Sequence, residues 1–269
     1  MKNNINKPFI KWAGGKQQIL ADLLQRMPKT YKRYFEPFCG SGALFFAINP
    51  HDATIADINT ELINCYVQVK DNVEELIESL KNHVNSKDYF YSIRGKNPIS
   101  LTNIERASRF LYLNRTCFNG LYRENQKGQF NVPFGSYKNP DFVQENKLRT
   151  SNKALQYTDI LGANYSESLK KVAKGDFIYL DPPYFPLGGY SDFKRYNKVF
   201  FEKKDHVELS HLFAKLDKAG CYVMLSNSDT EFTRELYGKW VIKTVQARRL
   251  INCDATKRGL ISEILVTNY

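Results

Sequence analysis

Short apolar runs that stop at a carboxylate or a turn residue alternate along this chain with longer amphipathic segments. The predicted strands are residues 33–38, 53–57, 176–181 and 221–226, with two more near 240–245 and 261–267. The predicted helices are residues 43–49, 61–83 and 205–218, where apolar side chains recur at three- and four-residue spacing. Alternation of strands with helices favours a mostly parallel sheet covered by helices on both faces. The sequence therefore predicts an α/β fold with a doubly wound, Rossmann-like sheet.

A helix-rich stretch interrupts this alternation after the second strand. Residues 58–153 begin with helical patterns and continue into a segment rich in Gly, Asn and Pro, residues 114–137. We interpret 58–153 as an inserted, largely helical domain. The sheet domain then consists of residues 1–57 and 154–269.

The charge balance points to a polyanionic partner. The chain has 39 Lys and Arg against 28 Asp and Glu, a formal net charge of +11, which suits nucleic acid or an anionic membrane surface. No apolar run approaches membrane-spanning length and the amino terminus has no secretory h-region, so we expect a cytoplasmic protein with no membrane partner. Five scattered cysteines without a CxxC pair, and four histidines without ligand spacing, predict reduced thiols and no metal. The oligomeric state is left open, and a monomer is compatible with the sequence.

A glycine loop follows the first predicted strand and opens a helix. Its residues are Phe38, Cys39, Gly40, Ser41 and Gly42, and glycine there permits tight turning and close approach of a ligand to the backbone. Asp57 ends the next strand, where a carboxylate can accept hydrogen bonds from ribose hydroxyls. An ordinary turn explains the loop alone equally well, but the loop together with Asp57 favours a nucleoside cofactor. An NAD enzyme stays open at this point, although the GxGxxG spacing is absent.

The amino-terminal segment Lys11-Trp-Ala-Gly-Gly-Lys16 resembles a phosphate loop only in part. The first glycine is missing, and Gln17 stands where such a loop needs Ser or Thr, which disfavours ATP binding. A basic arm with a packed tryptophan is an equally good interpretation.

The tetrapeptide Asp181-Pro182-Pro183-Tyr184 carries the most specific chemistry. It lies at the carboxyl end of a predicted central strand, where open α/β sheets bind ligands. Two prolines remove two N–H donors, so the loop presents carbonyl acceptors beside the carboxylate. Asp181 and the carbonyl of Pro182 can together accept both hydrogens of an amino group, and Tyr184 offers a ring on which a base can stack.

These motifs together resemble the Dam-type, D12 class adenine-N6 DNA methyltransferases. The similarity covers almost the whole chain and includes KWAGGK (11–16), EPFCGSG (36–42), ADIN (56–59), LYLNRTCFNGLYRENQKGQFNVPFGSY (111–137), DPPY (181–184) and the SN-x-D segment (226–229). DPPY alone would also suit other amino-group methyltransferases. The resemblance implies a methyltransferase that uses S-adenosylmethionine and acts on double-stranded DNA, with 58–153 as the target-recognition domain.

The resemblance also assigns roles to single residues of this chain. The implied catalytic residues are Asp181, Pro182 and Tyr184. The implied cofactor contacts are Trp12, Lys16, Phe38, Gly40, Ser41, Gly42, Asp57, Asp159 and Asp181. The implied DNA contacts are Lys11, Arg115, Phe118, Asn119, Leu121, Arg123 and Pro133, with Lys11 and Arg123 reading guanines at the two ends of a GATC site. Phe118 stands where the relatives usually have an intercalating tyrosine.

The residues of the insertion agree with DNA binding. Four arginines and no acid lie between Arg106 and Arg123, and residues 239–258 hold six basic residues against one acid. The aromatic side chains Phe110 and Tyr112 are interpreted as core. We also expect residues 185–201 to close over a base rotated out of the duplex. Two alternatives remain open from the sequence: a non-catalytic DNA-binding protein, and an amino-group methyltransferase acting on RNA or on cytosine N4.

Overall fold

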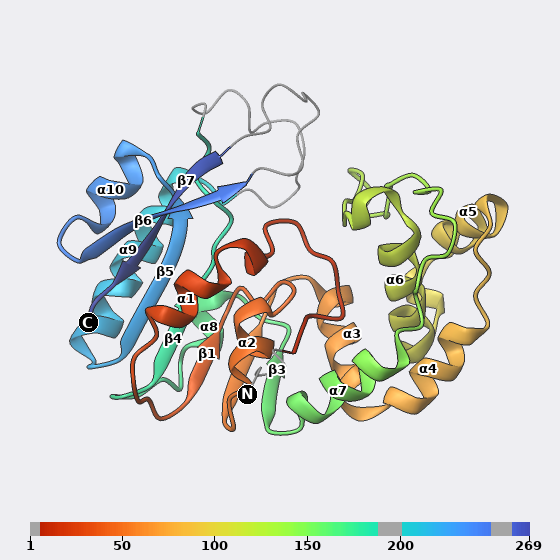
Figure 1. The fold of residues 1–269 in the computed structure, drawn as a ribbon, viewed down its shortest axis with the longest axis horizontal. Coiled ribbons are helices and arrows are strands. Elements are labelled where there is room, and N and C mark those ends of the chain that lie inside the picture. Colours follow the sequence, from red (N-terminus) through yellow and green to blue (C-terminus); the bar gives the residue numbers. More distant parts are fainter. Residues whose placement is uncertain (1–5, 188–200, 249–259) are drawn as a thin grey trace. The chain divides into compact units, whose positions relative to one another are not determined.

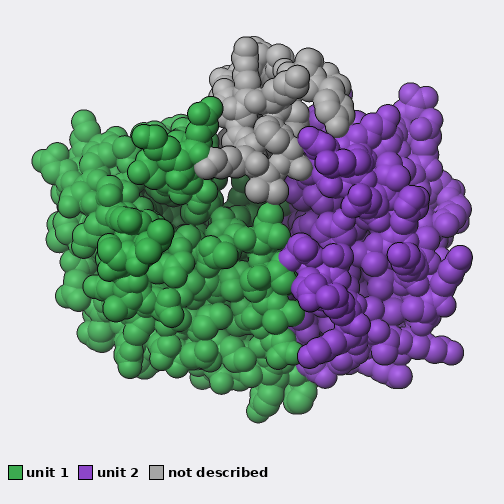
Figure 2. Space-filling model, turned by 180° about the vertical axis from the view of Figure 1, so that it is seen from behind, with its two compact units in different colours: residues 1–15, 39–51, 56–163 green, residues 16–38, 52–55, 164–269 purple. Residues whose placement is uncertain are grey.

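The computed structural model describes residues 6–187, 201–248 and 260–269, and the chain divides into two compact units (Figures 1 and 2). Unit 1 consists of residues 1–15, 39–51 and 56–163, and unit 2 of residues 16–38, 52–55 and 164–269. Within the described ranges, no helix combines the length and the apolar character that crossing a membrane requires. Most of the predicted closing loop, and part of the basic stretch 239–258, lie outside the described residues.

Seven strands run through the described residues in the sheet order β3-β2-β1-β4-β5-β7-β6. Their bounds are β1 Tyr34–Glu36, β2 Ala53–Ala56, β3 Thr158–Leu161, β4 Phe177–Leu180, β5 Tyr222–Ser228, β6 Val241–Arg248 and β7 Leu260–Thr267. Strand β1 pairs in parallel with β2 and β4, and β4 pairs in parallel with β5. Strand β7 runs antiparallel to both β5 and β6. The predicted mostly parallel α/β sheet is confirmed.

A large apolar cluster of unit 2 lies on one face of its sheet. Along β4 all four side chains are buried, as expected of a strand covered on both faces. Ile178 and Leu180 point into an apolar cluster with the helices α9 (Lys203–Lys218) and α10 (Glu231–Tyr237), which lie beside β5 and β6 in Figure 1. Because side chains alternate along a strand, Tyr179 and then Asp181 face the other side. That alternation places the predicted catalytic carboxylate on the face opposite the α9–α10 cluster.

Unit 2 also holds the short segments η1 (Lys16–Gln18), α1 (Leu20–Gln25) and α8 (Tyr165–Ser168). Lys16 and Leu23 are buried, which ties the start of unit 2 into its interior.

Unit 1 is mainly helical. Its helices are α2 (Ala43–Ile48), α3 (Thr60–Asp71), α4 (Val73–Lys81), α5 (Lys87–Gly95), α6 (Asn103–Thr116) and α7 (Glu145–Leu155), with one-turn segments η2 (Pro98–Ser100) and η3 (Phe118–Gly120). A capping box between Thr102 and Glu105 starts α6, the helix that runs into the predicted recognition segment. Phe110 and Tyr112 on α6 are buried, at 4% and 0% exposure, which confirms their interpretation as core.

Two details of the sequence prediction are wrong. The single helix expected over residues 61–83 is two helices, because the backbone of Asn72 between α3 and α4 is non-helical; its backbone N–H still donates to the Gln68 carbonyl, and its side-chain amide donates to the Gln68 side chain. Strand β3 was not among the predicted strands. Its Thr-Asp-Ile-Leu sequence is short and half exposed, so it lacks the apolar run that marks a buried strand.

Candidate functional site

Asp181 directly follows β4 and is held by two donors from other parts of unit 2. The ammonium of Lys16 lies 2.9 Å from Oδ1, and the hydroxyl of Ser226 donates to the same oxygen at 2.8 Å. The Asp181 side chain is 17% exposed, and burial raises its pKa although Lys16 and Ser226 act in the opposite direction. No described residue donates to Oδ2. The carboxylate is therefore fixed in place through one oxygen while the other retains its acceptor capacity.

The ring of Tyr184 is fixed from two sides. The ammonium of Lys16 lies 4.5 Å from the ring centroid, and the tyrosine hydroxyl donates to Oε2 of Glu263 at 2.8 Å. Glu263, on β7, is 9% exposed, and burial raises its pKa. Sequence reasoning missed Glu263. The available signal was an acidic residue inside a mostly apolar predicted strand.

The end of β5 holds the backbone that follows the tetrapeptide. Asn227 accepts a hydrogen bond from the backbone N–H of Phe185 at 3.0 Å, and the Ser228 hydroxyl donates to the Phe185 carbonyl at 2.6 Å. Ser226 precedes both and contacts Asp181. The Ser-Asn segment quoted for the family resemblance thus fixes the position of the DPPY loop on both sides.

His206 supports this arrangement from α9. It is fully buried, its Nδ1 lies 3.5 Å from the Asn227 amide nitrogen, and its Nε2 has no hydrogen-bond partner among the described residues. Rings of Phe185, Phe201 and Phe232 surround it at centroid distances of 4.7–6.3 Å. Burial lowers the pKa of His206 to about 4. His206 packs inward from α9, whereas His211 on the same helix is exposed.

In unit 1 the glycine loop is joined to Asp57 by hydrogen bonds. The carboxylate accepts from the backbone N–H of Gly40 at 3.2 Å and from that of Asn59 at 2.9 Å, one bond to each oxygen. Burial raises the pKa of Asp57, and these amide donors partly oppose that rise. Gly40 has a left-handed backbone (φ 46°), and a Cβ there would lie 2.7 Å from the Trp12 ring. The position therefore requires glycine for both its conformation and its space.

The indole of Trp12 is packed within unit 1. It stacks on Tyr122 at 5.4 Å and on Phe110 at 6.4 Å, with interplanar angles of 25° and 28°. The packed tryptophan considered from the sequence is confirmed, and its proposed cofactor contact is compatible with that packing. Asp159 is exposed on β3, next to the point where the Asp57 N–H donates to the Leu161 carbonyl at 3.2 Å.

The predicted cofactor residues divide between the units. Unit 2 contributes Lys16, Phe38 and Asp181, and Phe38 stacks on Tyr165 at 5.3 Å. Unit 1 contributes Trp12, Gly40, Ser41, Gly42, Asp57 and Asp159. Within each unit the structure brings together Lys16 with Asp181, and Trp12 with Gly40 and Asp57.

The predicted DNA contacts all belong to unit 1. After α6 the chain forms a narrow loop closed by the bridges Cys117–Phe134 and Glu124–Phe130. Phe118 is 52% exposed, and its backbone N–H donates to the Pro133 carbonyl. Arg123 is exposed, with its Nε donating to Asn131 at 2.8 Å. Leu121 is half-buried, while Asn119 and Pro133 are exposed.

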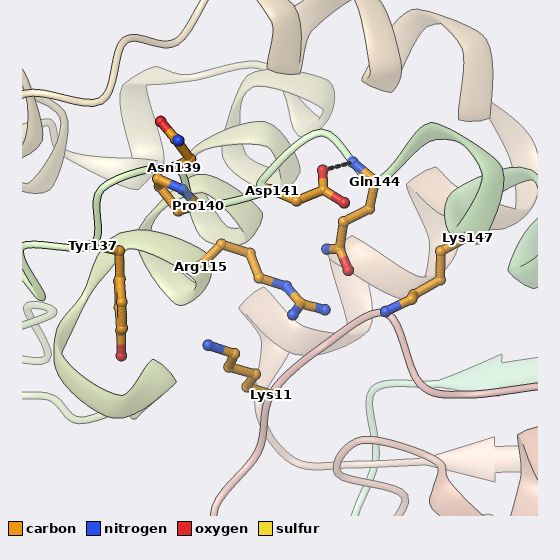
Figure 3. Close-up of a pocket in the computed structure, with 8 residues that line it drawn as sticks. All are labelled: Lys11, Arg115, Tyr137, Asn139, Pro140, Asp141, Gln144 and Lys147. Carbon is orange, nitrogen blue, oxygen red and sulfur yellow. Dashed lines mark hydrogen bonds between the residues drawn. The ribbon is translucent and has the colours of Figure 1, made fainter.

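Lys11 and Arg115 line a pocket of about 260 Å³ on the same unit (Figure 3). Its other lining residues are Tyr137, Asn139, Pro140, Asp141, Gln144 and Lys147. The arm that carries Lys11 is anchored to α6, because its backbone N–H and carbonyl both bond the side chain of Asn114. Sequence reasoning missed Lys147, which reaches this pocket from α7.

The chain is similar to DNA methyltransferases over most of its length. Residues 12–251 match the family model described as D12 class N6 adenine-specific DNA methyltransferase. The chain is 44% identical to Type II methyltransferase M1.LlaDCHI of Lactococcus lactis subsp. cremoris, over 100% of this chain and 98% of the relative. It is 41% identical to Type II methyltransferase M.MjaIII of Methanocaldococcus jannaschii, over 98% and 99%. It is 34% identical to the DNA adenine methylase of Escherichia coli K12, over 97% and 94%.

Proposed function

The chain belongs to the D12 class N6 adenine-specific DNA methyltransferases, and we propose that it transfers a methyl group from S-adenosylmethionine to N6 of an adenine rotated out of duplex DNA, within the sequence GATC. The observation that supports this best is the geometry of Asp181. Its carboxylate ends β4 beside two prolines and an aromatic ring, and Lys16 and Ser226 hold it through a single oxygen. Such an arrangement suits the binding of an amino group.

The residues of unit 1 fit a nucleoside cofactor. Each oxygen of Asp57 takes one backbone N–H, so each keeps a lone pair with which to accept a ribose hydroxyl. The backbone at Gly40 has no side chain, which allows close approach to the loop. The residues proposed to hold the cofactor are Trp12, Lys16, Phe38, Gly40, Ser41, Gly42, Asp57, Asp159 and Asp181. When bound, S-adenosylmethionine supplies a methyl group on a positively charged sulfur.

The catalytic role of this chain is positioning and electrostatic stabilisation. Asp181 and the carbonyl of Pro182 accept the two N6 hydrogens of adenine and draw the nitrogen lone pair out of conjugation with the ring. Tyr184 stacks on the base. Positive charge that develops on N6 during direct in-line transfer is stabilised by the Asp181 carboxylate. The product ammonium then loses a proton without a general base, because it is strongly acidic.

Recognition is proposed to rest on the exposed loop of unit 1. Arg123 and Lys11 read the guanines, and Phe118 fills the space that the rotated adenine leaves in the stack. Asn119, Leu121 and Pro133 contact neighbouring base pairs, and Arg115 contacts the DNA backbone. The half-exposed Phe118 ring and the exposed Arg123 side chain support this assignment.

The experiment is transfer of tritium from labelled cofactor to matched duplexes. One duplex carries GATC, a second carries GATC with N6-methyladenine already in place, and a third carries a scrambled site. The wild-type protein should label only the first, and Asp181→Asn should lose transfer while still binding DNA. Asp88→Asn, an exposed aspartate on α5, is the matched control and should keep full activity.

Three results would refute the proposal. Labelling of RNA or of cytosine would assign a different amino-group substrate. Binding without any transfer by the wild-type protein would indicate a non-catalytic DNA-binding protein. Near-normal turnover by Asp181→Asn would remove the role given to the carboxylate.

A further inference from the structure

The pocket of Figure 3, called here the basic pocket, collects more positive than negative charge. Its lining includes three cationic side chains, Lys11, Arg115 and Lys147, and a single carboxylate, Asp141. The Oδ1 of Asp141 accepts the backbone N–H of Gln144 at 2.9 Å, so one of its oxygens is already occupied within the pocket wall. Within residues 6–187, 201–248 and 260–269, no carboxylate forms an ion pair with any of the three cations. The pocket thus has a formal charge of about +2.

Two of the three cations, Arg115 and Lys147, come from different helices and point toward each other. Figure 3 shows the guanidinium of Arg115, from α6, directed at the ammonium of Lys147, from α7. The Arg115 side chain is fixed, since one terminal nitrogen donates to the Phe9 carbonyl at 2.6 Å. Burial lowers the pKa of both Lys147 and Arg115, and mutual repulsion lowers that of Lys147 further. A bound anion between the two side chains would offset their repulsion and would stabilise the charged form of each buried cation.

The pocket shares a wall with the loop that is proposed to read DNA. The ammonium of Lys11 lies 5.2 Å from the ring centroid of Tyr137, and the hydroxyl of Tyr137 accepts the backbone N–H of Asn119 at 3.1 Å. An occupant of the pocket would therefore lie beside residues proposed to contact the recognised bases. The volume of about 260 Å³ accommodates a tetrahedral phosphate group with several waters.

We infer that the basic pocket is the seat of one backbone phosphate of the DNA substrate, held between Arg115 and Lys147. This inference rests on the proposed function and extends it, because it adds α7 to the DNA-binding surface. A phosphodiester carries one negative charge and accepts hydrogen bonds in the fork geometry of a guanidinium. Such a contact positions the duplex without reading its sequence.

The test compares two lysines on the same helix. Lys147→Gln removes a cation from the pocket, and Lys153→Gln removes an exposed cation from α7 outside it. Binding of a GATC duplex and of a scrambled duplex is measured by fluorescence anisotropy from about 50 to 300 mM salt. One neutralised phosphate contributes roughly 0.9 to the slope of log K against log salt. Lys147→Gln should reduce that slope by about 1 and weaken both duplexes equally, whereas Lys153→Gln should leave the slope unchanged.

A second measurement locates the contact. Each phosphate near the site is replaced in turn by an uncharged methylphosphonate, and every duplex is bound to wild type and to Lys147→Gln. At one position the substitution should weaken wild type by about tenfold but weaken Lys147→Gln clearly less, because in that variant only the Arg115 contact remains to be lost. Equal slopes for the two lysine variants, or additive losses at every phosphate, would overturn the inference.

Two further outcomes distinguish the phosphate seat from binding of free phosphate and from the proposed enzymatic function. If inorganic phosphate raises the thermal stability of wild type but not of Lys147→Gln while the DNA slopes match, the pocket binds free phosphate and the inference fails. If the slope and methylphosphonate results are as expected while wild type transfers no methyl group, the phosphate seat stands and the proposed enzymatic function fails.

Discussion

The phenol of Tyr184 donates a 2.8 Å hydrogen bond to the carboxylate of Glu263, a residue 79 positions further along the chain. This bond links the last residue of the DPPY tetrapeptide to β7, the antiparallel neighbour of β5. Because the bond restrains rotation of the phenol, Glu263 acts on the proposed stacking surface without touching a substrate. It is a positioning residue.

Loss of this bond should lower methyl transfer. Tyr184→Phe keeps the ring but not the hydroxyl, and we expect kcat/KM to fall about tenfold, or ~1.4 kcal/mol, in line with a hydrogen bond to a charged group. Glu263→Ala should have a similar effect, and Glu263→Gln, which keeps an acceptor, a smaller one. Steady-state kinetics on a GATC duplex measure each variant.

A double-mutant cycle distinguishes this role from general destabilisation. Tyr184→Phe combined with Glu263→Ala should be no worse than the more damaging single change, because both remove the same bond. Glu235→Ala, an exposed glutamate on α10, is the control and should be unaffected. Fully additive losses would show that Glu263 does not act through the Tyr184 hydroxyl.

Replacement of Arg123 should relax specificity rather than abolish binding. Its Nε is occupied by Asn131, while its two terminal amino groups have no hydrogen-bond partner among the described residues, which suits a bidentate contact to guanine. Arg123→Ala should reduce discrimination at one base pair by about 1–3 kcal/mol. Competition binding with duplexes altered at each position of the site measures this. The same loss for every duplex would identify Arg123 as a backbone contact, and exposed Lys127→Ala in the same loop serves as the control.

Burial of neutral histidines should make the folded state sensitive to mild acid. The pKa of His206 is lowered to about 4, below the ordinary value of 6.5, so the unfolded chain takes up the proton first. Stability contributed by the neutral ring is present above pH 6.5 and is lost as pH falls from 6.5 toward 4. The shift corresponds to about 3 kcal/mol as an order of magnitude. His83, whose pKa burial also lowers to about 4, contributes in the same direction.

Denaturant unfolding between pH 7 and pH 4 tests this expectation. His206→Phe should flatten the loss of stability with falling pH, and His211→Gln, at an exposed position on the same helix, should leave the wild-type profile unchanged. An identical slope for His206→Phe and wild type would show that His206 is not the titrating group.

A methyl group at Gly40 should damage both folding and cofactor binding. The left-handed backbone costs an L residue roughly 1–2 kcal/mol, and the new Cβ would lie 2.7 Å from the Trp12 ring. Gly40→Ala should lower the free energy of unfolding by at least that amount and weaken binding of S-adenosylmethionine at least tenfold, as measured by calorimetry.

Gly95→Ala provides the matched control, because a Cβ at that residue of α5 meets nothing within 4 Å. It should be neutral or slightly stabilising. Unchanged stability and cofactor affinity in Gly40→Ala would contradict the close approach between the loop and Trp12.

Local patterns were sufficient to predict much of the fold. The apolar run at 177–180 is a buried strand, and the helical spacing of residues 205–218 is helix α9, because each pattern reports a periodicity of the backbone itself. The same reasoning placed Asp181 at the carboxyl end of a central strand. The division of the chain into a sheet domain and an inserted recognition domain at residues 58–153 stays a prediction.

Contacts between residues far apart in the chain were decided only by the tertiary structure. Nothing near Glu263 in the sequence connects it to Tyr184, and nothing near Lys147 connects it to Arg115. The sequence alone determined which chemical groups the chain carries and which short segments form strands or helices, since those depend on neighbouring residues. Which groups then share one site depends on how the strands pair and the helices pack, and that is set by the free energy of the whole fold rather than by any local pattern.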